Sequence, residues 1–145
     1  MEHLVKLSEE VRNGDTKAGI HYKLMNDIDL IRSLGMNGGI GWIPIGLREK
    51  IFSGHFDGNN KIIRNLYINN NTRYQPWGDC YYVGLFGRVE GGSIKNLGVE
   101  NVDITNVVFS AGVIGGIIIS SSVMEQCYAK NGVVRGVVEV GGCVP

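Results

Sequence analysis

The segment Ile63-Arg-Asn-Leu-Tyr-Ile68 recurs as Ile94-Lys-Asn-Leu-Gly-Val99 and, more loosely, as Met124-Glu-Gln-Cys-Tyr-Ala129. The three copies therefore begin at Ile63, Ile94 and Met124, with a nearly constant step between them. A glycine block precedes each copy and reads Ser53-Gly-His-Phe-Asp57, Val83-Gly-Leu-Phe-Gly87 and Ala111-Gly-Val-Ile-Gly115; a further step of the same length reaches Gly142. Two blocks that keep one period indicate a true internal repeat, and a period of this size is typical of proteins that stack one unit on the next.

The composition indicates that the stacked units are made of strands. The 145 residues include 32 Ile and Val but only 9 Leu and 3 Ala, and branched side chains fit a pleated surface better than a helix. The 22 glycines, with Asn and Asp, separate short apolar runs in the manner of turns. A hydrophobic content of 43% argues against a disordered chain.

We therefore predict an all-β protein, a right-handed parallel β-helix (β-solenoid) with a short N-terminal capping α-helix. It would form a single β-helix domain over residues 1–145. The expected parts are a helical cap at 2–13, entry strands at 20–46, repeat coils at about 52–82, 83–110 and 111–139, and the start of a further, truncated repeat at 140–145. The cap follows from Leu4, Leu7 and Val11, which recur at helical spacing before Asn13-Gly14.

Stacking of the units predicts columns of equivalent residues about 4.8 Å apart. The predicted apolar columns are Ile63, Ile94 and Met124; Leu66, Leu97 and Cys127; and Ile68, Val99 and Ala129. The predicted polar column is Asn65, Asn96 and Gln126, where side-chain amides could form a ladder at a bend in left-handed conformation. We read this polar column as architecture and not as chemistry.

The predicted helix is followed in order by Tyr22-Lys-Leu-Met-Asn-Asp-Ile-Asp-Leu30, Trp42-Ile-Pro-Ile-Gly46 and Phe52-Ser-Gly-His-Phe-Asp-Gly-Asn-Asn-Lys-Ile-Ile-Arg-Asn-Leu66. With the glycine blocks Gly84-Leu-Phe-Gly87 and Gly112-Val-Ile-Gly115 and with Gln126-Cys-Tyr-Ala129, this order resembles that of the GLUG-motif proteins. These are bacterial cell-surface, adhesin-like proteins, some of which accompany IgA-cleaving metallopeptidases. The resemblance covers nearly the whole chain. It implies a secreted or surface-displayed β-solenoid that is part of a longer polypeptide, and it supplies no catalytic residue.

No catalytic residue, metal site or cofactor is predicted. Ser53, His55 and Asp57 alternate along one predicted strand, which would present them side by side without an oxyanion hole. The three histidines are scattered, and Asp57-Gly-Asn-Asn60 lacks the acidic repeat and closing Glu of a calcium loop. The three cysteines lack CxxC spacing, which gives no sign of a disulfide framework.

The predicted ligand-binding residues are Arg73, Tyr74 and Trp77, in the polar segment 70–79. Exposed aromatic side chains beside polar groups can stack on sugars or anchor a protein partner. The alternative is that Trp77 folds back onto the wall of the coil.

The leading functional hypothesis is a non-enzymatic extracellular surface module, an adhesin-like stalk or ligand-presenting β-solenoid from a bacterial cell-surface protein. The alternatives are a polysaccharide-processing β-helix enzyme and an accessory domain of a surface peptidase. The expected partner is a host glycan or surface protein, with self-association through the C-terminal coil. Fourteen basic and fourteen acidic residues without a basic run argue against nucleic acid. The longest apolar run, 107–119, is glycine-interrupted and too short for membrane insertion.

Overall fold

The computed structural model describes residues 1–72, 74–75, 78–79, 81–106, 110–119, 121–136 and 139–141. Its helical elements are α1 (Glu2–Arg12) and two 3-10 helices, η1 (Ile31–Gly35) and η2 (Asn37–Gly39). The strands are β1 (His21–Lys23), β2 (Ile28–Asp29), β3 (His55–Arg64), β4 (Tyr67–Asn70), β5 (Tyr74–Gln75), β6 (Gly78–Asp79), β7 (Tyr82–Val83), β8 (Phe86–Glu90), β9 (Ser93–Asn106), β10 (Ser110–Gly112), β11 (Gly115–Ile119), β12 (Val123–Glu125), β13 (Tyr128–Gly136) and β14 (Glu139–Gly141). The predicted all-β class with one short N-terminal helix is confirmed.

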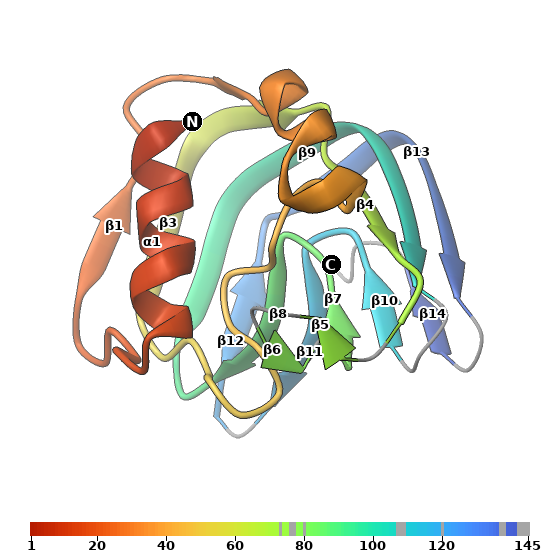
Figure 1. Ribbon diagram of the computed structural model, residues 1–145. Helices are drawn as coiled ribbons and strands as arrows, with labels where there is room; N and C mark the ends of the chain where they lie inside the picture. Colours follow the sequence, from red (N-terminus) through yellow and green to blue (C-terminus); the bar gives the residue numbers. More distant parts are fainter. Residues whose placement is uncertain are drawn as a thin grey trace.

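The main sheet is built from parallel neighbours that the chain reaches once per repeat. Its order is β1-β3-β9-β12, with β2 beside β3 and with β4 and β13 beside β9. In Figure 1 its long strands run side by side from β1 at the left to β13 at the right. We call each passage through this sheet a rung: β1–β2, β3–β4, β9 and β12–β13. The right-handed parallel β-helix itself stays a prediction.

Three smaller sheets complete the strand pairing of the described residues. β14, β10 and β7 form one parallel sheet, and β11 pairs with β8 in parallel. β5 and β6 form an antiparallel hairpin. Within the described residues, no helix combines the length and the apolar character that a membrane crossing requires.

The predicted columns are correct between the third and fourth rungs and wrong between the second and third. Ile94 pairs with Met124 and Val99 with Ala129, as predicted. Ile63, however, pairs with Val99 and not with Ile94, whose partner is Phe56. The other two predicted columns fail in the same way. Ile68 pairs with Ile104 and not with Val99, and Tyr67, the residue after Leu66, pairs with Asp103 and not with Gly98.

The third and fourth rungs each bend at two residues in left-handed conformation, and this duplication explains the misplaced columns. The third rung bends at Asn96 (φ 54°) and Asn101 (φ 56°), and the fourth repeats these bends at Gln126 and Asn131 (φ 53° and 56°). Asn65 (φ 62°) corresponds to the second bend of the third rung, because its backbone N–H donates to the carbonyl oxygen of Glu100, next to Asn101. The sequence repeat therefore aligned Asn65, at a second bend, with Asn96, at a first bend.

The left-handed conformation predicted for Asn65, Asn96 and Gln126 is confirmed, but the predicted amide ladder between them is wrong. Asn65 Nδ2 donates to Asp29 Oδ1 at 2.7 Å, and Asn96 Nδ2 donates to Asp57 Oδ1 at 3.3 Å. Each asparagine thus binds a carboxylate of the preceding rung.

The glycine block of the first repeat also lies elsewhere than predicted. Ile45 bridges Phe86 in parallel, which aligns Trp42-Ile-Pro-Ile-Gly46 with Val83-Gly-Leu-Phe-Gly87. A Cβ on Gly87 would clash with the Gly46 carbonyl oxygen, so the two backbones need glycine at this approach. The predicted block around Gly54 instead adjoins Gly92, and Gly112 pairs with Gly141 and not with Gly142.

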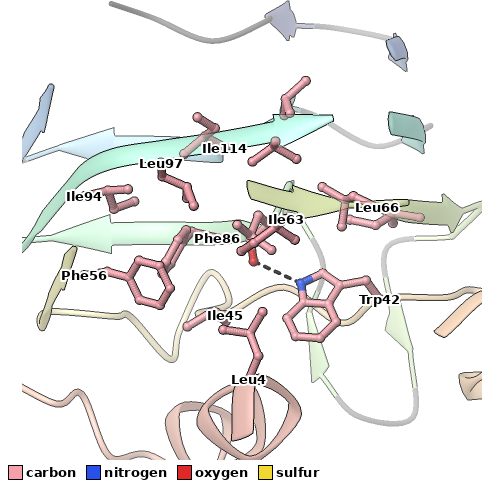
Figure 2. Packing of buried hydrophobic residues seen from close by; sticks show 14 of the residues in the cluster. Leu4, Trp42, Ile45, Phe56, Ile63, Leu66, Phe86, Ile94, Leu97 and Ile114 are labelled. Carbon is pink, nitrogen blue, oxygen red and sulfur yellow. Dashed lines mark hydrogen bonds between the residues drawn. The ribbon is translucent and has the colours of Figure 1, made fainter. Parts of the chain in front are cut away.

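The core is a continuous apolar cluster between the main sheet and the smaller sheets (Figure 2). Phe86 lies at its centre, with its ring 5.2 Å from the rings of both Phe52 and Phe56. The indole Nε1 of Trp42 donates to the Leu85 carbonyl oxygen at 3.0 Å, which satisfies a buried donor.

The helix α1 packs on this core close to the first rung, as Figure 1 shows. The predicted apolar stripe is buried: Leu4, Leu7 and Val11 are each no more than 4% exposed. Ser8, on the same face, donates its hydroxyl to the Ile43 carbonyl oxygen at 2.9 Å. The helix ends at Arg12, one residue before the predicted boundary.

Candidate functional site

The ligand-binding residues expected from the sequence fall largely outside the structural description. Arg73 and Trp77 lie outside the described residues. Tyr74 is described only as backbone, where it opens β5 opposite Asp79. Their role as a binding platform stays a prediction.

The outward face of the main sheet instead brings together a row of residues from four rungs. The parallel register aligns His21, His55, Ser93 and Val123, which we call the histidine row. The imidazoles of His21 and His55 stack with ring centroids 4.6 Å apart. His55 Nδ1 and Ser93 Oγ lie 2.8 Å apart and share a hydrogen bond whose donor depends on the histidine tautomer.

Two residues further along each strand lies a first charge row, which consists of Lys23, Asp57, Lys95 and Glu125. Its charges alternate from rung to rung. Asp57 accepts hydrogen bonds from the backbone N–H of Asn59 at 2.8 Å and from Asn96 Nδ2 at 3.3 Å. These bonds, together with Lys95 and Lys23 nearby, lower the pKa of the Asp57 carboxyl.

A second charge row beyond the bend alternates in the opposite order and consists of Asp29, Arg64, Glu100 and Lys130. Asp29 accepts bonds from Asn65 Nδ2 and from the Ile31 backbone N–H, at 2.7 and 2.9 Å, which lower its pKa. Opposite charges on neighbouring strands contribute about 0.2–1 kcal/mol per pair, and like charges destabilise. The two charge rows therefore support the observed register of the sheet.

The histidine row and the first charge row enclose a surface cavity of about 330 Å³. We call it the histidine–lysine cavity, and its polar lining is His21, Lys23, His55, Asp57, Ser93 and Lys95. The backbones of Tyr22 and Phe56 separate the two rows, because these intervening residues alternate to the opposite face of the sheet. Every polar group of the cavity comes from β1, β3 or β9, so a rigid sheet sets their spacing.

The triad considered for Ser53, His55 and Asp57 is not assembled. His55 bonds to Ser93 on the next strand, and the Asp57 carboxylate bonds to Asn59 and Asn96. The sequence repeat aligns Ser53, His55 and Asp57 with Val83, Leu85 and Gly87, and this alignment is wrong. The register of the sheet places Ser93 opposite His55 and Lys95 opposite Asp57. Among the described residues, no three His, Cys, Asp or Glu side chains are grouped as a metal site would require.

Sequence reasoning missed His21, Ser93 and Lys95 as members of one site. A signal was present in the tripeptides His21-Tyr-Lys23, His55-Phe-Asp57 and Ser93-Ile-Lys95. Each reads polar, apolar, charged, and each pairs with the next in the sheet. The step from the first tripeptide to the second is shorter than the step from the second to the third, which hid this pattern from a search at one fixed period.

Comparisons with known proteins give two distant relatives of much greater length. Over 88 residues, 60% of the chain, the sequence is 40% identical to a "Putative Gly-rich membrane protein" of Evansella cellulosilytica, of which the match covers 9%. Over 150 aligned residues, 99% of the chain, it is 27% identical to "Halomucin" of Haloquadratum walsbyi, of which it covers 2%. The chain thus spans less than a tenth of either relative. No profile of a known family and no solved structure matches the chain.

Proposed function

We propose that the chain is a non-enzymatic, ligand-presenting module of a bacterial cell-surface protein, with the fold of a right-handed parallel β-helix. The observation that carries this proposal is the outward face of the main sheet. Four rungs align polar and charged side chains in straight rows, and three of these rungs enclose the histidine–lysine cavity. A surface of this kind can hold an elongated ligand without supplying reactive groups.

The β-helix is supported by the way in which the chain returns to the main sheet. Each of its four rungs pairs in parallel with its neighbours, and the smaller sheets β14-β10-β7 and β11-β8 are also parallel. A parallel pair needs a long crossover, and here the crossovers supply the strands of the other sheets. The resemblance to GLUG-motif proteins, carried by the glycine blocks, belongs to the same proposal.

The extracellular, cell-surface location is supported by the relatives. One of them is described as a membrane protein, and both are more than ten times longer than the region they share with this chain. A repeat module within a long polypeptide suits a stalk, because each unit needs contacts only with its neighbours.

The absence of catalysis is supported by the state of the reactive side chains in the cavity. Two bonds from Asn59 and Asn96 hold the Asp57 carboxylate, and the pKa of Asp57 is lowered, which disfavours a role as a general acid. Among the described residues of the cavity, the His55–Ser93 pair most resembles a nucleophile with its base. The test must therefore include this pair.

The experiment is a binding and turnover assay on the purified chain with a panel of neutral and anionic polysaccharides. We expect reversible binding to at least one polymer, with no release of reducing ends after prolonged incubation. Release of reducing ends that disappears in Ser93→Ala or His55→Gln would refute the non-enzymatic proposal. If the chain binds none of the polymers, ligand presentation is refuted and a stalk remains as the proposed role.

A further inference from the structure

We infer that the histidine–lysine cavity binds an anionic polysaccharide, through carboxylate or sulfate groups carried at intervals along an extended sugar chain. This inference rests on the proposed function and names its ligand class. Three features of the cavity support it: two lysines without ion-pair partners among the described residues, a stacked pair of histidines, and a carboxylate that is already satisfied by hydrogen bonds.

The lysines supply the positive charge of the site. Lys23 and Lys95 form no ion pair within 4 Å with any residue that the structure describes, although each adjoins Asp57 in the first charge row. They lie two strands apart, which places their Cα atoms about 10 Å from each other. Both ammonium groups are therefore free to bind anions at two points along one chain.

The carboxylate between the lysines cancels only part of this charge. Asp57 accepts bonds from the Asn59 backbone and the Asn96 side chain, which hold it to the bend beside it. Two lysines and one aspartate leave the lining with one net positive charge, and Glu125, which adjoins Lys95 in the first charge row, lies on the fourth rung outside the lining. An anionic ligand over the first three rungs thus meets two cations and one carboxylate that already accepts hydrogen bonds from the protein.

The histidines add polar surface beside the lysines. The stacked rings of His21 and His55 lie 4.6 Å apart on the first two rungs, and His55 Nδ1 shares a hydrogen bond with Ser93 Oγ. The remaining ring nitrogens can form hydrogen bonds with the hydroxyl and anionic groups of a sugar chain.

The shape of the site favours a polysaccharide over a compact anion. The cavity extends across three neighbouring rungs, and its lysines lie on the first and third of them. Many acidic polysaccharides carry their charge on alternate sugars of an extended chain, which matches cations that are separated along the stack. The balanced charge of the whole chain, 14 basic against 14 acidic residues, argues against nucleic acid as the polyanion.

The test measures binding of the full chain to hyaluronate, dextran sulfate and uncharged dextran by titration calorimetry at pH 7.5. The cavity variant is Lys23→Gln with Lys95→Gln. The charge-matched control is Lys6→Gln with Lys50→Gln, which removes two exposed lysines outside both charge rows and outside the cavity lining. Circular dichroism checks that each variant is folded.

We expect the anionic polymers to bind at least about tenfold more tightly than dextran, because each exposed ion pair can change an affinity by up to about fivefold. The cavity variant should lose about tenfold in affinity and the control less than twofold. Binding of only one anionic polymer supports the inference and identifies carboxylate or sulfate as the group. Equal binding of dextran, or equal loss in the cavity and control variants, would overturn the inference. Binding of dextran alone would still leave the proposed function standing, whereas release of reducing ends would refute that function instead.

Discussion

Replacement of Leu97 by alanine tests whether the third rung lies in the middle of the stack. Leu97 is 0% exposed, and the backbone of β3 closes over it, since a Cβ on Gly58 would lie 2.6 Å from the Leu97 Cα. A buried Leu→Ala change costs about 2–5 kcal/mol, and the cost rises with the cavity that remains. The walls of the cavity left by this change are strands of the neighbouring rungs, which cannot move inward without breaking the backbone hydrogen bonds between the strands. We expect a loss of about 3–4 kcal/mol, above the lower end of that range.

Urea unfolding followed by circular dichroism measures this loss. With a slope of about 2 kcal/mol per molar, the midpoint should fall by about 2 M. The melting temperature should fall by roughly 10 °C for a chain of this length. The slope itself should not change, because the folded state buries nearly the same surface.

The matched control is Leu34→Ala, the same chemical change at a side chain that is 40% exposed in η1. It should cost less than about 1 kcal/mol, since little buried surface is lost. Equal losses in the two variants, or a loss below about 1.5 kcal/mol for Leu97→Ala, would refute the reasoning that the rungs form one rigid stack.

Three further predictions concern the bends, the carboxylates and the hairpin. Asn96→Leu should lower the free energy of unfolding by about 1–2 kcal/mol because a branched side chain is strained at positive φ. Asn96→Gly should cost less than about 1 kcal/mol, since glycine adopts this conformation freely. Thermal melts of both variants would separate the strain from the loss of the hydrogen bond to Asp57. Folding lowers the pKa of the Asp57 carboxyl, chiefly through the bond from the Asn59 backbone N–H. Its contribution to stability is therefore present above the unfolded pKa of about 4 and is lost as pH falls through the folded pKa. Asp57→Asn should flatten the acid side of the stability–pH curve, and an unchanged acid side would contradict this. If Tyr74 and Trp77 form a ligand platform, their double replacement by alanine should abolish polysaccharide binding with little change in melting temperature, whereas a large loss of stability without an effect on binding would assign them to the core.

The sequence was sufficient to predict the parts of the fold that depend on local chemistry. The helix over 2–13 follows from the spacing of Leu4, Leu7 and Val11, and all three side chains are buried. The left-handed conformation at Asn65 and Asn96 follows from the tolerance of asparagine for positive φ. Neither prediction needed knowledge of which strands pair.

The candidate site could not be predicted in the same way, because it is assembled by pairing between distant strands. His21, His55 and Ser93 come from three rungs that follow one another at unequal steps along the chain. The steps are unequal in part because the second rung carries Gly58, Asn59 and Asn60 where the third has only Asn96, so the register shifts between Asp57 and Lys61. A single fixed period therefore aligned the wrong residues on this side of the stack.

The charges of the chain contain the information that the repeat did not. If Ile63 had faced Ile94, as the repeat suggested, Arg64 would have faced Lys95, and like charges on neighbouring strands are destabilising. In the observed register Arg64 faces Glu100 and Asp57 faces Lys95, so both contacts become attractive. Each surface pair is worth no more than about 1 kcal/mol, but the wrong alignment removes one attractive pair from each charge row and adds the repulsive Arg64–Lys95 pair. Where two bends of similar sequence lie close together in one rung, as Asn96 and Asn101 do, the apolar residues fit either alignment, and the sign of the outward charges decides between them.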